Sequence, residues 1–569
     1  MYIDKVPNRK SPPAILLREG KREGNRIIKR TIANLSHWPE EKIENLKRVL
    51  KGETLIPANE AFCIQNSLPH GHVEAVLTTI RTLGFDKLLS GRRIPERDLV
   101  IGMIVEQIIH SCSKLASTRL WHTTTLAEEM SVTDADEDDL YDAMDWLLAR
   151  QERIEKKLAQ RHLQEGSTVL YDVSSSYYEG RECPLAQFGH SKDKKKGKTI
   201  IVYGVMTDDV GRPIAVEVYP GNTGDPTTVA DQVDKLRVRF ELSRVLLVGD
   251  RGMLTQSRID TLRDYPGIGW VSALRSSSIR TLVEDKHLQM SLFDDQNLAE
   301  ISSPDYPGER LIACMNPLLK EQRHRKRQEL LAMTEKALRK ISQQVARQTR
   351  TPLNEAEIGV KVGKVVNRYK MAKHFRLAIE DGSFSWKRNE ESIAREAALD
   401  GVYVIRTSES EGNLSAADTV RTYKSLAQVE RLFRTLKGID LRIRPIRHRT
   451  EDHVRAHILL CTLAYYIEWH MRRALAPLLF NDEELEDNRK TRDPVLPVQP
   501  SETVKSKKSK KVTAEGYPVH SFETLLKELA TCCRNRCSMS SSPNGATFDQ
   551  LTQRTPLQQR AMELLKCSQ

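Results

Sequence analysis

The sequence has little that would cross-link the chain or hold it in a membrane. Its nine cysteines are scattered through 569 residues, without the paired spacings of a zinc site or the density of a disulfide scaffold. The longest apolar run, from Ile458 to Ile467, has about half the length that a bilayer-spanning helix needs. The first residues lack the apolar region of a signal peptide. We therefore expect a cytoplasmic protein that does not act in a membrane.

The composition is that of a globular protein with an excess of positive charge. Hydrophobic residues make up 39% of the chain and charged residues 29%, and the formal net charge is +12. Lysines and arginines in such excess favour a polyanionic partner, because binding phosphates releases counterions. The length suits several domains.

The apolar pattern changes several times along the chain. Residues 1–30 are basic, and Ala14 to Arg18 with Arg26 to Ile32 predict a β-hairpin. From Val73 to Leu163 the apolar spacing is helical. Short β-branched runs follow at 168–172, 199–206, 213–219, 245–250 and 270–274, with a helix after the third that has Asp225 as its N-cap. The predicted parts are a basic arm with a hairpin (1–50), a helical domain (51–165), an α/β core in two pieces (166–275 and 401–480), an interrupting segment (276–400), a flexible linker (481–520) and a helical tail (521–569).

The interrupting segment is expected to contain a long basic helix. Between Leu318 and Arg350 there is neither glycine nor proline. Its apolar positions recur at alternating steps of three and four, as in a helical packing seam. The members of this seam are Leu331, Thr334, Leu338, Ile341 and Val345.

Three carboxylates occupy positions that suit a metal site. Asp172 and Asp250 each follow an apolar strand-like run, and Glu430 lies in a helix-like segment rich in basic residues. Two-metal phosphodiester chemistry needs hard anionic oxygens that converge on Mg²⁺. Either aspartate alone would be read as an ordinary residue at a strand end. With the glutamate they predict a Mg²⁺ site that meets DNA.

The glutamate helix carries its own signals. Ser415 followed by Asp418 forms a capping box, and Gly438 marks the end. Tyr423, Glu430 and Lys437 are spaced by seven, which on an ideal helix returns to within about 20° of one direction. We expect one helix that presents all three on one face.

These motifs resemble the DDE transposases of bacterial insertion sequences, in the fourth insertion-sequence family, whose members carry a Tyr-x₂-Arg-x₃-Glu-x₆-Lys box. Tyr423, Glu430 and Lys437 are in register with the box, but Leu426 takes the arginine position. Lys424, Arg431 and Arg434 are the candidates to replace that arginine. The similarity runs from about 165 to 470 and includes Tyr171 to Tyr178, Val248 to Met253 and Arg444 to His448.

The resemblance implies a ribonuclease-H-like core with an insertion between Asp250 and Glu430. It implies that Asp172, Asp250 and Glu430 bind Mg²⁺ or Mn²⁺, and that Tyr423 and Lys437 contact DNA phosphates. Trp386 is the candidate to stack a flipped base, with packing in a hydrophobic core as the alternative.

As a transposase, the protein would cleave double-stranded DNA at the terminal inverted repeats of its element and join the 3′-hydroxyls to target DNA, as a homodimer on paired ends. The alternatives are a structure-specific nuclease with a related core and a DNA-binding regulator derived from a transposase.

Two further clusters have competing explanations. His448, His453 and His457 have spacings that a transition metal can use, but packing and capping explain them as well. The run Lys192 to Lys198, with five lysines, is either a phosphate-facing loop or simply exposed.

Overall fold

The computed structural model describes residues 1–9, 11–53, 62–193, 195–294, 296–485, 487–489, 491–539 and 546–567. The chain divides into two compact units. Unit 1 comprises Met1–Pro69 and Cys532–Gln553, and unit 2 comprises His70–Thr531 and Arg554–Gln569.

Unit 1 contains two small antiparallel sheets. In the first, β2 and β3 form the predicted hairpin, with Gly24 at a φ of +62° in the turn. The second joins a strand that precedes the helical region to two strands near the C-terminus, in the order β16-β15-β4. Residues 521–569 are therefore not helical throughout, because β15 pairs with a partner from the other end of the chain. The elements are β1 (Tyr2–Val6), β2 (Ala14–Glu23), β3 (Arg26–Asn34), α1 (Glu40–Leu50), β4 (Phe62–Pro69), β15 (Cys533–Met539) and β16 (Thr547–Leu551).

Unit 2 begins with the predicted helical region. Helix α4 is buried on nearly all sides and packs against α7 and the long helix α17. Among the described residues no single helix has the length and hydropathy to cross a bilayer, although the bent pair Pro95–Ile109 and Lys114–Thr123 passes that test by composition. The helices are α2 (Gly71–Thr82), α3 (Phe85–Leu89), α4 (Pro95–Ile109), α5 (Lys114–Leu120), α6 (Leu126–Met130), α7 (Glu137–Leu148), α8 (Gln151–His162) and α17 (Glu451–Ala474).

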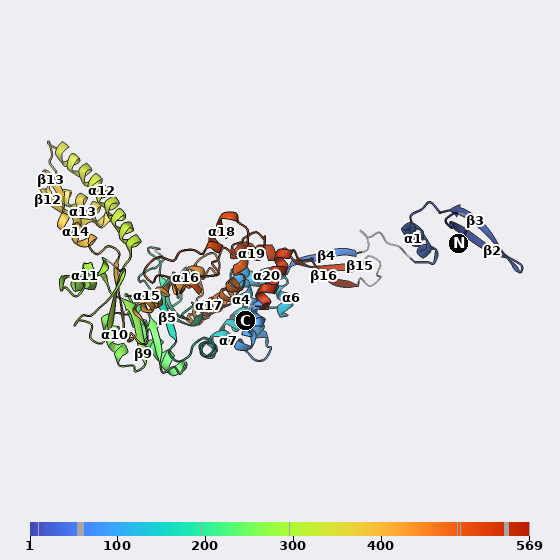
Figure 1. The fold of residues 1–569 in the computed structure, drawn as a ribbon, viewed down its shortest axis with the longest axis horizontal. Helices are drawn as coiled ribbons and strands as arrows, with labels where there is room; N and C mark the ends of the chain where they lie inside the picture. Colours follow the sequence, from blue (N-terminus) through green and yellow to red (C-terminus); the bar gives the residue numbers. More distant parts are fainter. Residues whose placement is uncertain are drawn as a thin grey trace. The chain divides into compact units, whose positions relative to one another are not determined.

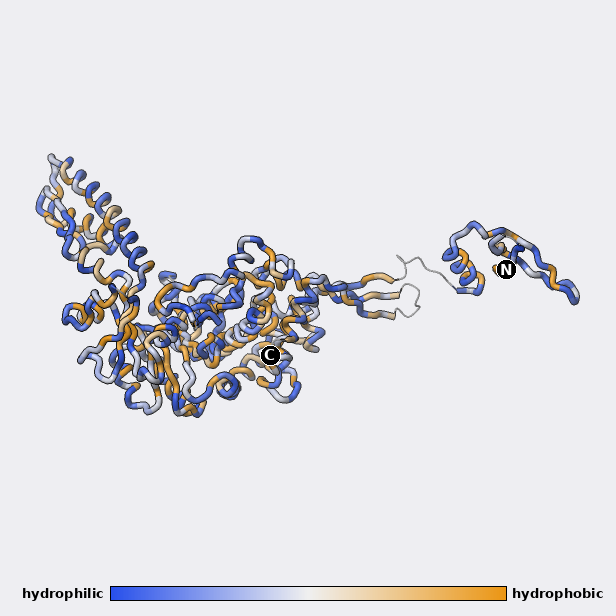
Figure 2. The backbone as a smooth tube through the Cα atoms, in the orientation of Figure 1, coloured by the Kyte–Doolittle hydropathy of each residue, from blue (hydrophilic) through white to orange (hydrophobic). Residues whose placement is uncertain are grey.

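An eight-stranded mixed sheet forms the centre of unit 2, in the order β10-β11-β14-β9-β8-β5-β6-β7. Strands β5, β8 and β9 run parallel, whereas β6 and β7 continue from β5 in antiparallel pairs. The hydrophobic colour in Figure 2 follows these strands, because helices cover the sheet. The five predicted strands are β5 (Thr168–Tyr177), β6 (Ile200–Asp208), β7 (Pro213–Pro220), β8 (Val245–Val248) and β9 (Ile268–Ala273), and the others are β10 (Leu298–Ile301), β11 (Arg310–Met315) and β14 (Val402–Thr407).

The helix after β7 does not start as predicted. Its first turn is a 3-10 helix, Asp225–Thr228, with Gly224 as the N-cap and no capping side chain. Helix α9 (Val229–Asp234) and a π-helical turn (Lys235–Arg239) follow. The Asp225 carboxylate accepts a hydrogen bond from Lys192 instead.

Within the predicted insertion 276–400, residues 317–397 form a packed body with its own core. All five predicted seam residues of α12 are buried, against α13 and the β12–β13 hairpin, and these elements lie together around α12 in Figure 1. Strands β10 and β11, which were not predicted, extend the large sheet. The elements are α11 (Ser276–Glu284), α12 (Pro317–Arg347), α13 (Glu355–Tyr369), β12 (Phe375–Glu380), β13 (Ser383–Arg388) and α14 (Glu390–Ala397).

The predicted linker 481–520 is more structured than expected. It contains α18 (Glu502–Lys510), in which Lys507 is buried, donates to the Ala476 carbonyl over 3.0 Å and pairs with Glu483. Val504 on the same helix is also buried. Helices α19 (Phe522–Ala530) and α20 (Pro556–Cys567) pack against α2.

The seam of α12 supports a stability prediction. Leu338 is 0% exposed, whereas Met333 on the same helix is 53% exposed. Leu338→Ala should lower the free energy of unfolding by about 2–5 kcal/mol, because it leaves a cavity. Met333→Ala is the matched control and should change it by less than about 0.5 kcal/mol. Urea unfolding of both variants measures the difference, and equal stabilities would contradict the seam.

Candidate active site

Asp172 and Asp250 lie at the same edge of the large sheet. In the parallel ladder Leu170 is opposite Val248, and each aspartate stands two residues further on. Asp172 is not at a strand end as predicted, because β5 continues to Tyr177 in its pairing with β6. The parallel ladder with β8 stops at Leu170, so Asp172 lies where the sheet opens.

The backbone after β8 holds Asp250 in place. Its Oδ1 accepts hydrogen bonds from the N–H groups of Gly252, at 2.9 Å, and Met253, at 2.8 Å. This tight turn follows the strand directly and leaves the carboxylate exposed. One oxygen is therefore fixed by the main chain, and no hydrogen bond to Oδ2 occurs among the described residues.

Glu430 reaches this edge on α16 (Leu426–Lys437), which packs on β5. Glu430 itself is exposed. Gly211, in the β6–β7 turn, has a φ of +90°, and a Cβ there would lie 2.8 Å from the Cβ of Gln428. Only glycine lets the turn come this close to α16. The apolar face of the helix consists of Leu426, Val429, Leu432, Phe433 and Leu436.

The predicted single helix is in fact two. Ser415 caps α15 (Ala416–Lys424), accepting from the Asp418 N–H as expected, and α16 ends at Gly438. Ser425 separates them, and its hydroxyl donates to the Arg421 carbonyl over 3.1 Å. Serine bonds of this kind compete with the regular helical pattern, and the side chain of Arg489 also donates to Ser425.

All three carboxylates affect the ionisation of one tyrosine. Burial, followed by the negative charges of Asp250, Glu430 and Asp172, raises the pKa of Tyr423 to about 12, while the charge of Arg251 acts in the opposite direction. The structure thus brings Tyr423 and all three predicted carboxylates into one electrostatic neighbourhood.

The three carboxylates are not tightly clustered. Within the described part of the chain, only Glu106, His110 and Cys112 place three such ligand atoms within 4.8 Å of one another. The Asp172, Asp250 and Glu430 oxygens are therefore spaced more widely than that limit. A pair of metal ions about 3.5–4 Å apart distributes its ligands over a wider span than one ion does.

Burial is the main reason why the pKa of Asp172 is raised to about 6. The charges of Asp250 and Asp225 act in the same direction, and Lys192 and the Val173 N–H act in the opposite direction. The Val173 N–H donates to Oδ1 over 2.7 Å. A partly buried carboxylate beside a second one is a donor set that a hard divalent cation suits.

Lys192 and Asp225 belong to the same neighbourhood and were not predicted there. Lys192 Nζ donates to the Val173 carbonyl over 2.5 Å and to Asp225 over 2.9 Å. The lysine run had suggested a loop facing phosphate, but Lys192 turns inwards to β5. Lys194, in the same run, lies outside the described residues.

The side chain of Lys437, the last residue of the box, is held in place by other residues of the chain. Its Nζ donates to the Ser175 carbonyl over 2.5 Å and pairs with Asp193 over 3.1 Å. Asp193 is only 2% exposed and also pairs with Arg444. Lys437 therefore ties the end of α16 to β5, a contact that sequence spacing had not indicated.

The other predicted DNA contacts fall into two groups. Arg431 and Arg434 are exposed on α16. Lys424 instead donates to the Val495 carbonyl over 2.7 Å. Leu426, at the arginine position of the box, is buried. Trp386 lies in the separate core of residues 317–397, where its ring meets Phe375 edge to face at 5.8 Å.

The histidines pack together rather than presenting a metal site. His457 is half-buried and lies 3.2 Å from the Ile443 carbonyl, and its ring is 4.9 Å from that of His448. Burial, followed by the charge of Lys114, lowers the pKa of His457 to about 4. The packing explanation therefore applies.

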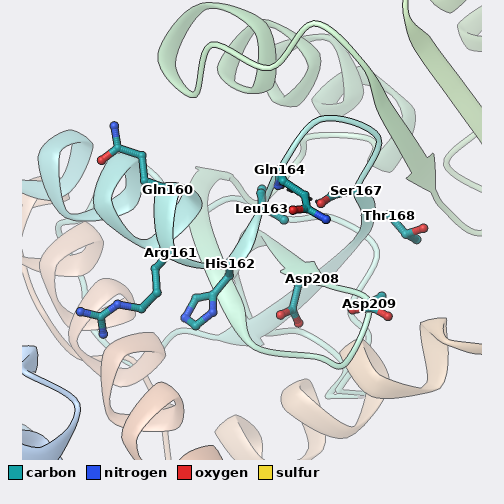
Figure 3. A pocket seen from close by; sticks show the side chains of 9 residues that line it. All are labelled: Gln160, Arg161, His162, Leu163, Gln164, Ser167, Thr168, Asp208 and Asp209. Atoms are coloured by element: carbon teal, nitrogen blue, oxygen red, sulfur yellow. Dashed lines mark hydrogen bonds between the residues drawn. The ribbon is translucent and has the colours of Figure 1, made fainter. Parts of the chain in front are cut away.

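A cavity of about 470 Å³ lies at the other end of β5. Figure 3 shows it between the end of α8, the start of β5 at Thr168, and Asp208 with Asp209 at the end of β6. Asp208 pairs with Arg212 over 2.5 Å. This cavity is separate from the carboxylates around Tyr423.

Comparisons with known proteins agree with this geometry. The family model of the transposase DDE domain matches residues 165–467, more than half of the chain. The chain belongs to the DDE transposases of bacterial insertion sequences, which are metal-dependent DNA-cleaving enzymes. Residues 3–60 are also similar to the N-terminal domain of IS1634 family transposases.

One solved structure and the curated proteins complete the comparison. A cryo-EM structure of a piggyBac transposase synaptic complex with hairpin DNA matches at 12% identity and a TM-score of 0.25, covering 78% of this chain and 88% of that one. None of the curated proteins matches the chain.

The raised pKa of Asp172 predicts a pH-dependent stability. Its pKa is about 6 when folded against 3.8 as the ordinary value, so stability is lost as pH rises between these values. Without metal at pH 7.5, Asp172→Asn should therefore raise the free energy of unfolding, by roughly 2–3 kcal/mol.

Guanidinium unfolding in EDTA at pH 7.5 and pH 4 tests this expectation. The gain should fall below about 1 kcal/mol at pH 4, where Asp172 is protonated in the folded state and close to half protonated in the unfolded state. Asp209→Asn, at an exposed aspartate, should give no comparable gain. An Asp172→Asn variant no more stable than the wild type at pH 7.5 would contradict the assigned environment.

Proposed function

We propose that this protein cleaves the ends of an insertion sequence and joins the freed 3′-hydroxyls to target DNA. The observation that supports the proposal is the shared sheet edge of Asp172 and Asp250 together with the packing of α16, which bears Glu430, on β5, in a chain of the DDE transposase family. The substrates are double-stranded DNA with terminal inverted repeats and target DNA, bound by a homodimer in the cytoplasm.

The strand order supports a ribonuclease-H-like core. Strands β7, β6, β5, β8 and β9 lie side by side in that order, with β5 central and parallel to β8. Functional groups of such open sheets gather at the carboxyl ends of the parallel strands. Residues 276–400 would then be an insertion between Asp250 and Glu430.

The metal ligands we propose are Asp172, Asp250 and Glu430, with Mg²⁺ or Mn²⁺ as the cation. Asp250 offers Oδ2, since the main chain occupies Oδ1, and Asp172 offers a carboxylate already perturbed by its neighbour. Bound cations would activate the attacking oxygen and stabilise the leaving one.

The surrounding residues would bind and orient the DNA. With a pKa near 12, Tyr423 keeps its proton at neutral pH, so its hydroxyl can donate to a phosphate oxygen. Arg431 and Arg434 are the exposed cations next to Glu430 on α16. Lys437 would act from its fixed place at the end of that helix, and the role of Trp386 in stacking a flipped base remains part of the proposal.

Cleavage assays test the proposed ligands. Duplexes bearing the terminal repeats that flank the gene should be cut only with Mg²⁺ or Mn²⁺. Asp172→Asn, Asp250→Asn and Glu430→Gln should each lower the rate by on the order of 10³-fold or more, as expected for groups that act in the transition state. Glu391→Gln, at another exposed helical glutamate, is the matched control and should cut normally.

Two further measurements distinguish the proposed transposase from a nuclease and from a DNA-binding regulator. Mg²⁺ should raise the melting temperature of the wild type but not that of Asp172→Asn. This measurement does not depend on having the cognate DNA. The transposase should join precleaved ends to target DNA. Neither a nuclease nor a DNA-binding regulator would carry out this step. Full cleavage by all three variants would refute the proposed site.

A further inference from the structure

A second cavity, of about 720 Å³, lies in unit 2 between the α4–α5 connection, the start of α7 and residues 442–450 before α17. Its walls bring together segments that are far apart in the sequence. Tyr141 and His453 stack at 4.7 Å with an interplanar angle of 19° and form a flat aromatic wall. The role proposed above for the carboxylates makes no use of this cavity.

Cations dominate the lining. Five lysines and arginines face two acids, Glu137 and Asp138, and the cations are Lys114, Arg442, Arg444, Arg447 and Arg449. Arg444 is paired with Asp193, and Arg447 with Glu179 over 3.1 Å, although Arg447 remains 72% exposed. Arg442 and Arg449 are exposed and have no hydrogen bond or ion pair within the described ranges. Arg442 and Arg449 therefore add positive charge to the cavity that no side chain within these ranges pairs with directly.

Lys114 is the most unusual of these cations. It is only 6% exposed, and among the described residues its ammonium has no hydrogen bond or ion pair. Glu106 is near, but its two oxygens accept from Cys112, over 3.3 Å, and from Trp121. Burial lowers the pKa of Lys114. A buried ammonium without a partner is costly, and an anion in the cavity would supply the missing partner.

A cation is a poor occupant of the same place. Glu106, His110 and Cys112 lie close enough to share a metal ion. However, of these three residues only Cys112 lines the cavity. The positive charge of Lys114, which also lines it, would repel a metal ion there, so the chemistry favours an anion.

The cavity is connected to the candidate active site through one buried carboxylate. Asp193 pairs with Arg444, which lines the cavity, and with Lys437, which ends the Glu430 helix. Arg444 Nε also donates to the Lys437 carbonyl over 3.2 Å. A DNA strand held at the carboxylates would thus have a basic cavity beside its path.

We propose that this cavity binds a phosphate group of a DNA strand engaged at the candidate active site, with Arg447 and Arg449 at its mouth and Lys114 buried within it. The identity of the ligand as DNA rests on the proposed function. The phosphate is either a 5′-terminal phosphate, which can reach a buried lysine, or an internal one held by the arginines at the mouth. Arginine forks suit both.

Fluorescence anisotropy of the full-length protein in EDTA tests the proposal without any cleavage. The probes are one duplex carrying a 5′-phosphate and the same duplex with a 5′-hydroxyl. Arg447→Gln combined with Arg449→Gln should weaken binding at least tenfold at moderate salt. It should also lower the slope of log K against log[salt] by about 1.8, from two lost phosphate contacts. The matched control, Arg153→Gln with Arg237→Gln, removes two exposed arginines outside the cavity and should bind within threefold of the wild type.

The two probes distinguish the sources of the phosphate. A preference for the 5′-phosphate that disappears in Lys114→Gln supports a terminal phosphate, and equal loss for both probes in the arginine variant supports an internal one. If the arginine variant binds both probes within threefold of the wild type with an unchanged salt slope, the proposal is overturned. Binding in EDTA requires neither the metal nor cleavage, so failure of the cleavage site and failure of the cavity give different results.

Discussion

The packing of α16 on β5 is the contact on which the rest of the site depends. Two carboxylates already share the edge of the sheet through the β5–β8 ladder, but Glu430 comes from far along the chain. The apolar face of α16 fixes the height and rotation of the helix, and Lys437 fixes its end through Ser175 and Asp193. Because apolar side chains in a protein interior are closely packed, a substitution at Gly211 or Phe433 would move Glu430 just as a substitution next to Glu430 would.

The site holds like charges together at a cost to the folded state. Asp172 ionises less readily because it is buried and near Asp250. Tyr423 keeps its proton because it is buried and because the charges of the three carboxylates act on it. The ammonium of Lys192, which donates to the Val173 carbonyl, offsets part of this repulsion. Functional sites commonly retain such unfavourable electrostatics, and a divalent cation is the partner that would relieve them.

Asp193 couples two basic features that would otherwise be independent. One buried carboxylate positions both Lys437 and Arg444, so the end of the glutamate helix and the wall of the basic cavity share an anchor. This arrangement explains why a lysine expected to contact phosphate directly is instead neutralised in the free protein. Exposed positive charge near these two features is carried by arginines, on α16 and at residues 442–449.

The sequence by itself determined the local features of this protein: the five core strands, the hairpin of β2 and β3, the cap at Ser415, the seam of α12, and the three carboxylates with their box. These depend on side-chain periodicity and on hydrogen bonds between near neighbours, which are written in adjacent residues. Tertiary structure alone decided the rest. The break at Ser425, the continuation of β5 beyond Asp172, the pairing of β4 with β15, and the inward turns of Lys192 and Lys437 each depend on a partner distant in the chain. Such partners are chosen by burial and charge pairing in three dimensions, so no spacing rule along the sequence could reveal them.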